Sequence, residues 1–105
     1  MELSRPSWIE IDLSAVAHNV RLARKIVGNS VKIYAVCKAD AMGCGLVPIA
    51  RTYIQAGADS LAVSDPNDVI ILRDAGIQVP ILLFASTLPE QAAEVARLDA
   101  IPVIH

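Results

Sequence analysis

The sequence predicts an α/β protein in which helices cover a parallel sheet. Short apolar runs alternate with segments of helical periodicity, and from residue 31 onward the runs begin 29, 21 and 20 residues apart. That spacing is typical of compact strand–helix repeats. The runs are apolar at successive positions, as in strands that are buried on both faces. Two architectures satisfy these observations, a doubly wound open sheet and part of a (β/α)8 barrel.

The strands are expected where β-branched and apolar residues cluster. Residues 8–13 (WIEIDL) alternate apolar and polar, which predicts a half-buried first strand. Residues 31–37 (VKIYAVC) are nearly all apolar and predict a buried strand. Further short strands are expected at residues 60–63, 81–85 and 101–104.

Each intervening segment carries signals for the start or end of a helix. In the first, Ser14 is the expected N-cap, and Gly28 can take the positive φ that follows a helix end. The second carries apolar residues at helical spacing over 46–54 and stops at Gly57. Asp65 and Pro66 are a cap and a first-turn proline for the third helix, which is expected to end at Gly76. The fourth is expected to begin in a capping box over residues 87–90.

Composition excludes several classes of protein. The chain has 105 residues, of which 54% are apolar, with a mean hydropathy of +0.49 and a net charge of −2. It is too apolar for a disordered tail, and it lacks the basic charge of proteins that bind nucleic acids or membrane surfaces. No apolar run is long enough to span a membrane, and the first residues do not resemble a secretory signal. Two cysteines do not form a disulfide framework, so a cytoplasmic location is expected.

Several polar side chains are expected to be structural. His18 and His105 have no second ligand at metal spacing, so no metal site is predicted. Arg21, Arg24 and Lys25 are expected to form a solvated basic face on the first helix. The length allows one domain, but so apolar a chain implies surface that other segments cover, so we expect a piece of a larger protein.

The most informative segment lies at residues 36–45 (VCKADAMGCG), where Lys38 ends a buried strand and closely spaced glycines precede the next helix. Ligands of parallel α/β proteins bind at the carboxyl ends of the strands, which is where Lys38 is expected. Two roles for Lys38 remain open from chemistry alone. Its ammonium group can reach solvent, or its neutral amine, favoured by burial, can react with an aldehyde.

This segment resembles the VxKAxAYGHG signature of the bacterial alanine racemases. Residues 5–13 (RPSWIEIDL) are similar to the opening R-P-x-x-x-x-I-D-L of that family, and residues 56–63 (AGADSLAV) to its A-G-A-D-x-x-A-V segment. Residues 72–77 (LRDAGI) and 80–83 (PILL) are similar to L-R-x-A-G-I and P-I-L. The resemblance runs in order through essentially the whole chain.

The resemblance implies that residues 1–105 are the N-terminal part of a (β/α)8 TIM-type barrel that binds pyridoxal 5′-phosphate (PLP), without the rest of the barrel and a C-terminal β domain. It implies that Lys38 carries the cofactor covalently and is one of two catalytic bases of an amino-acid racemase acting on alanine or a similar small amino acid. By position, Val36, Met42 and Phe84 match residues that contact the cofactor. The second base belongs to a partner subunit in this family, so the resemblance implies a homodimer for the full-length protein and an inactive 105-residue chain.

Two residues depart from the family signature. Met42 stands where the signature has a tyrosine that contacts the cofactor phosphate, and a thioether cannot donate that hydrogen bond. Cys44 stands in place of the following histidine. These changes leave open a PLP-binding barrel without racemase activity. A cofactor-free, flavodoxin-like interaction module is the alternative from another class.

Overall fold

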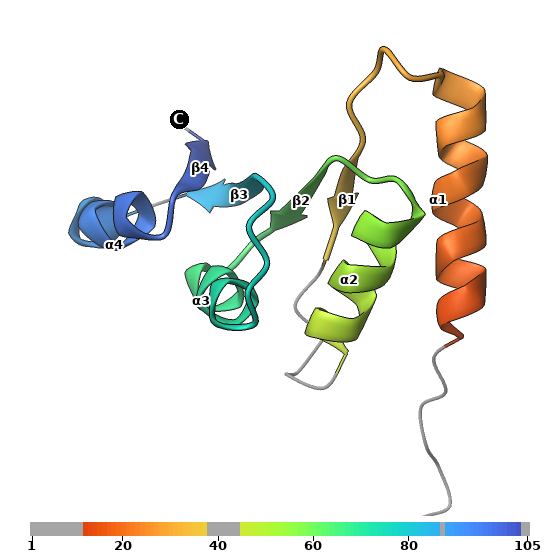
Figure 1. Ribbon diagram of the computed structural model, residues 1–105. Helices are drawn as coiled ribbons and strands as arrows, with labels where there is room; N and C mark the ends of the chain where they lie inside the picture. The colour runs from red at the N-terminus through yellow and green to blue at the C-terminus, as the bar shows by residue number, and fades with distance from the viewer. Residues whose placement is uncertain (1–11, 38–44, 87, 104–105) are drawn as a thin grey trace, which may run out of the picture.

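The computed structural model describes residues 12–37, 45–86 and 88–103 as a parallel sheet with helices packed against it (Figure 1). The elements follow one another along the chain as α1 (Leu13–Val27), β1 (Tyr34–Val36), α2 (Leu46–Ala56), β2 (Ser60–Val63), α3 (Pro66–Asp74), β3 (Ile81–Ser86), the 3-10 helix η2 (Pro89–Gln91), α4 (Ala92–Arg97) and β4 (Ala100–Val103). The predicted alternation of strands and helices is confirmed from β1 onward.

The order of the strands decides between the two predicted architectures. The sheet runs β1-β2-β3-β4, so each strand pairs in parallel with the next strand along the chain. Right-handed crossovers between successive neighbours place the connecting helices on one face of the sheet. Figure 1 shows α2, α3 and α4 along the outside of the fanned strands. This is the arrangement of a barrel wall, because a doubly wound sheet reverses its strand order and has helices on both faces.

The register separates a helix-facing side of the sheet from an open side. Ala35, Leu61 and Ile81 are paired across three strands and are all buried. One position further, Val36 pairs with Ala62, which pairs with Leu82. Val36 is 46% exposed although its chain neighbours on either side are buried, as expected for alternating side chains on a sheet that is covered on one face. Tyr34 and Ile101 are exposed on the same open side.

Large aliphatic residues of the helices and strands fill the core between the two layers. The largest fully buried side chains are Leu46, Leu61, Leu72, Ile81, Leu83, Val63 and Val69. Helix α1 does not cover the sheet directly but packs along α2, with Ala17 and Val20 buried. The apolar side chains of α1 are buried unequally, since Val20 is 7% exposed and Val27, at the carboxyl end of the helix, is 39% exposed.

Local signals in the sequence predicted most ends of helices and strands correctly, but the start of α1 and the start of β1 were predicted wrongly. Asp12, not Ser14, caps α1, because its Oδ1 accepts hydrogen bonds from the amides of Ser14 and Ala15. Leu13, predicted to end a first strand, is the first residue of this helix; residues 8–11 of that strand lie outside the described residues. Strand β1 is also shorter than the predicted 31–37, because pairing with β2 begins only at Tyr34.

The remaining helix ends agree with the sequence. Gly28, Gly57 and Gly76 all have positive φ and follow the ends of α1, α2 and α3, where a side chain would be strained. Asp65 caps α3 through a hydrogen bond from the Asn67 amide, with Pro66 in the first turn. The capping box predicted over residues 87–90 is an exception, because the structure places it one residue later. In η2 the N-cap is Leu88, and Gln91 Oε1, not Glu90, accepts from its amide; Thr87 lies outside the described residues.

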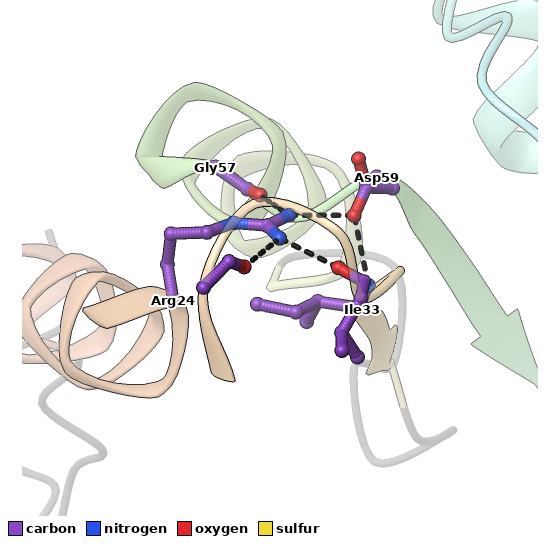
Figure 2. A network of polar contacts seen from close by, with 6 residues as sticks. Arg24, Ile33, Gly57 and Asp59 are labelled. Atoms are coloured by element: carbon purple, nitrogen blue, oxygen red, sulfur yellow. Dashed lines mark hydrogen bonds and ion pairs between the residues drawn. The ribbon is translucent and has the colours of Figure 1, made fainter. Parts of the chain in front are cut away.

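Arg24 joins the amino ends of β1 and β2 and is not part of a solvated face as predicted. Figure 2 shows its guanidinium at the centre of a polar network. The group donates to the carbonyls of Gly28, Val31 and Gly57 at 2.7–3.0 Å and to Asp59 Oδ2 at 2.6 Å. The same Asp59 oxygen accepts from the Ile33 amide at 2.8 Å. The amino ends of the first two strands are thereby held together.

Arg73 repeats this arrangement two strand–helix units later. Its guanidinium donates to the carbonyls of Ile77 and Val79, just before β3, and to those of Leu98 and Asp99, just before β4. Both arginines lie near the carboxyl end of a helix and reach the turn that enters a later strand. The amino edge of the described sheet is therefore fixed by two arginine networks, each joining one pair of strands.

Candidate active site

Two of the residues predicted to contact a cofactor, Val36 and Phe84, lie in the carboxyl halves of their strands. Val36 is the last residue of β1 and Phe84 lies in the carboxyl half of β3. Their side chains are 46% and 37% exposed. Lys38 and Met42, and Cys44 with them, lie outside the described residues. Lys38 follows Val36 by two positions in the sequence, directly after the described end of this strand.

Phe84 lies where β3 departs from regular pairing. Leu83 pairs with Pro102 and Ser86 with Val103, so two residues of β3 are inserted between these consecutive partners on β4. Such bulges bend a strand and redirect its side chains, and they are frequent beside active sites. Phe84 is one of the two inserted residues. Its ring is accordingly only partly covered at the edge where the sequence predicts a ligand.

Val36 and Phe84 have the chemistry of a wall for a planar aromatic group. Both are apolar, both are partly exposed at the carboxyl half of their strands, and they belong to strands separated only by β2. Two strand spacings correspond to about 10 Å. Their apolar character is compatible with contact to a planar ring.

The helix-facing side of the same edge contains a thiol and a carboxyl group. Cys37 continues the pairing of β1 by donating its amide to the Ala62 carbonyl at 2.8 Å, and its side chain is 3% exposed. Burial, with a smaller contribution from Asp68, raises the pKa of the Cys37 thiol to about 11. A thiol with so high a pKa is not a nucleophile at neutral pH, and Cys37 is a small residue of the buried core.

Asp68 is the residue of this edge that sequence reasoning missed. It is the third residue of α3, only 9% exposed, and its Oδ2 has no hydrogen-bond partner among the described residues. Burial, and secondarily the neighbouring carboxylate of Asp65, raise the pKa of the Asp68 carboxyl. In the sequence it looks like an ordinary acidic residue in the first turn of a helix. Only its position against the sheet distinguishes it.

A hollow over the described residues lies at the opposite edge. It is lined by Ile70, Arg73, Asp74, Gln78, Arg97, Leu98 and Asp99, before β3 and β4. Its two cations are engaged, Arg73 by four backbone carbonyls and Arg97 by Glu94. The apolar Val36–Phe84 edge is therefore the better candidate for a cofactor site.

The described part of the chain contains no group of three histidine, cysteine or acidic residues that could hold a metal ion. It also contains no helix long and apolar enough to cross a membrane. His18, considered in the sequence, is exposed on α1.

Comparison with known proteins gives a consistent result. Residues 11–105 match the family model described as alanine racemase, N-terminal domain. The alanine racemase of Halothermothrix orenii is 42% identical over 102 residues, covering 97% of this chain and 27% of that protein. The alanine racemase of Synechocystis is 44% identical over 99 residues, covering 93% of this chain and 27% of that protein. The chain spans about a quarter of the length of the curated relatives it matches.

Solved structures agree with the sequence comparison. The alanine racemase of Bacillus anthracis, determined with bound L-Ala-P, superposes with a TM-score of 0.88 at 34% identity over 99% of this chain and 27% of that one. The alanine racemase of Clostridium difficile 630 gives a TM-score of 0.86 at 30% identity, over 99% and 29%. The sequential parallel strands, the helices on one face and these matches agree: the chain belongs to the alanine racemase family, within the N-terminal domain and its barrel.

Proposed function

We propose that the protein carrying this chain is a PLP-dependent racemase that interconverts the L and D forms of alanine or a similar small amino acid. The observation that supports this proposal is the match to proteins named alanine racemase over nearly the whole chain. The partly exposed Val36 and Phe84 at the carboxyl edge of the sheet agree with a cofactor site there. Lys38 follows directly after this edge in the sequence.

Lys38 has two tasks in this proposal. Its amine holds the cofactor covalently, and it takes the α-proton from one face of the substrate or returns it. PLP supplies an electron sink that makes this proton acidic enough to be removed. Inversion requires a second acid–base group on the opposite face of the α-carbon, which we assign to the partner subunit of a homodimer.

The other residues of the proposed site bind and orient. Val36 and Phe84 pack against the cofactor ring and keep water from it. Met42 lies where the family signature has a tyrosine, and it offers no hydrogen bond to the phosphate. We therefore propose that PLP is held less tightly here than in proteins with the full signature, with Lys38 still supplying the covalent link.

A second function is favoured by the same two departures from the signature. Met42 and Cys44 replace a tyrosine and a histidine, which suits a PLP-binding relative that does not racemise. The cofactor-free, flavodoxin-like alternative does not fit, since the strand order β1-β2-β3-β4 is not that of a doubly wound sheet. We also propose that the protein is located in the cytoplasm.

The test is to incubate the complete natural protein with PLP, reduce it with borohydride and map the adduct by digestion and mass spectrometry. Reduction converts the link between an amine and an aldehyde into a stable bond. We expect one adduct, on Lys38, and none on Lys32, which is exposed at the other end of the same segment. The variant Lys38→Arg is expected to lose the adduct, whereas the control Lys32→Arg keeps it.

Assays of the same protein with L-alanine and with D-alanine separate the two functions. Interconversion supports the racemase. An adduct on Lys38 without turnover of either enantiomer supports the PLP-binding relative. A complete protein that carries no adduct on Lys38 contradicts both.

A further inference from the structure

The two arginine networks divide the described sheet into two pairs of strands. Arg24 donates to the turns that enter β1 and β2, and Arg73 donates to the turns that enter β3 and β4. The two arginines occupy equivalent places, because each lies on the helix that precedes the first strand of its pair. Each network therefore belongs to one set of two helices and two strands. We call these sets the first unit (residues 13–37 and 45–63) and the second unit (residues 66–86 and 88–103).

The line between β2 and β3, which we call the seam, has no such network among the described residues. Three residues of β2 pair with three of β3, the same number as between β1 and β2. The side-chain hydrogen bond that crosses the seam within the described ranges runs from Arg51 to the Ala75 carbonyl and is exposed. Most hydrogen bonds of the two networks are partly buried. Because shielded hydrogen bonds from a charged donor are the stronger ones, parting the sheet at the seam breaks fewer strong interactions than parting it elsewhere.

The proposed cofactor site has residues in both units. Val36 ends β1 in the first unit, and Phe84 lies in β3 of the second. The seam passes between these two strands, because β2 lies next to β1 and β3 follows β2 in the sheet. Ligand sites occur preferentially where two parts of a protein meet, and a ligand that contacts both parts favours their closed arrangement.

We propose that the two units unfold as separate cooperative units that part at the seam, and that a ligand in contact with both Val36 and Phe84 couples them. Proteins open in contiguous cooperative units whose opening free energies lie below that of global unfolding. A ligand that binds only the closed arrangement reduces the open population by mass action. The coupling rests on the proposed function, because PLP is the group assigned to this site. The division into two units does not.

The test is amide hydrogen exchange of the complete natural protein at increasing urea concentrations below the unfolding midpoint, read by mass spectrometry. Arg24→Met is compared with Arg21→Met, and Arg73→Met with Arg97→Met. Each control removes an exposed arginine from the same unit and leaves the network in place. Exchange is measured without PLP and at saturating PLP, and the yield of the Lys38 adduct is determined in parallel.

Without PLP, we expect Arg24→Met to speed exchange in the first unit by about thirtyfold or more and in the second by less than about threefold. Arg73→Met should show the reverse. The two controls should change exchange by less than about threefold in either unit. Arg24→Lys and Arg73→Lys keep the charge without the planar fork and provide the comparison if a methionine variant does not fold. In the wild type, saturating PLP should slow exchange in both units by about tenfold or more.

The outcomes separate this inference from the proposed function. Equal acceleration of both units by either network variant overturns the division, since the described chain would then unfold as one unit. If the Lys38 adduct forms but PLP slows exchange in one unit only, the coupling is wrong and the proposed function stands. If no adduct forms while each network variant still acts on one unit, the proposed function fails together with the coupling, and the two units stand.

Discussion

The two edges of the sheet are built on opposite principles. At the amino edge, Arg24 and Arg73 donate eight hydrogen bonds between them, all to carbonyl or carboxylate oxygens of the turns that enter the four strands. At the carboxyl edge, Val36 and Phe84 are left partly exposed, and a buried oxygen of Asp68 has no partner within the described part of the chain. The polar groups of the amino edge are hydrogen-bonded, whereas the carboxyl edge keeps apolar side chains partly exposed.

This difference agrees with the division of labour in barrel proteins, where stability concentrates at the amino ends of the strands and chemistry at the carboxyl ends. The arginine networks fix the strands relative to one another without touching the site. Residues at the other edge can therefore be chosen for ligand binding at some cost in stability. Mutations at the two edges should have separable effects on stability and on activity.

The largest expected effect is the loss of activity in Lys38→Arg. Arginine keeps the charge but cannot form the covalent link or accept a proton at neutral pH. We expect turnover of alanine to fall by about a thousandfold or more, the usual scale for losing a covalent catalyst and base. The urea midpoint should stay within experimental error of the wild type. A large shift of that midpoint would contradict the separation of the two edges.

The next effect is the loss of stability in Arg73→Met. Four carbonyls before β3 and β4 lose their donor, while methionine retains much of the aliphatic packing. We expect the free energy of unfolding to fall by about 2–4 kcal/mol, measured by urea denaturation. Arg97→Met is the control, since this side chain is 65% exposed and pairs only with Glu94 among the described residues. Equal losses in the two variants would show that the Arg73 network contributes nothing of its own.

A smaller effect is the dependence of stability on pH through Asp59. The hydrogen bond from the Ile33 amide, and then Arg24, lower the pKa of the Asp59 carboxyl below its ordinary value of 3.8. Its contribution is therefore complete above pH 3.8 and is lost as the pH falls through the lower pKa of the folded state. Asp59→Asn should remove this part of the acid sensitivity of the urea midpoint. If the urea midpoint of Asp59→Asn falls with decreasing pH as steeply as that of the wild type, other groups cause the acid sensitivity.

The smallest effect expected is a gain in cofactor affinity in Met42→Tyr. The variant restores the hydroxyl of the family signature, which can donate one hydrogen bond to a phosphate. We expect PLP to bind up to about tenfold more tightly, the equivalent of roughly 1.4 kcal/mol. Equilibrium titration followed by visible absorbance measures the change, and Met42→Phe is the control without the hydroxyl. Equal gains in the two variants would attribute the effect to packing.

Features encoded by neighbouring residues could be predicted from the sequence. Gly57 and Gly76 mark helix ends because of their φ angles, and Asp65 with Pro66 marks a helix start, all within a few residues. The cap at Asp12 was missed because Asp12 was assigned to an alternating strand pattern that continued to Leu13. At Asp12, the alternation of apolar and polar residues overlaps with the helix cap, and the cap decides the structure.

Features that depend on distant partners could not be predicted. Arg24 looks like one of several cations on a helix, and its partners Gly57 and Asp59 follow 33 and 35 residues later. Asp68 is distinguished only by its burial against the sheet. At the carboxyl edge, resemblance located Val36 and Phe84, and the structure adds their exposure and the bulge in β3. The roles of Lys38 and Met42 remain predictions.

The sequential strand order also bears on how the protein is made. The strands β1, β2 and β3 each hydrogen-bond to the strand that the ribosome delivers next, with one or two helices between them. A growing chain can therefore add strand–helix units one at a time, from the amino end. Both edge strands, β1 and β4, have one side without a partner strand among the described residues. A following strand in the same order would pair with β4 and leave the outer side of β1 open. In a closing barrel that side is completed by the last strand, so translation time determines how long β1 stays exposed to aggregation.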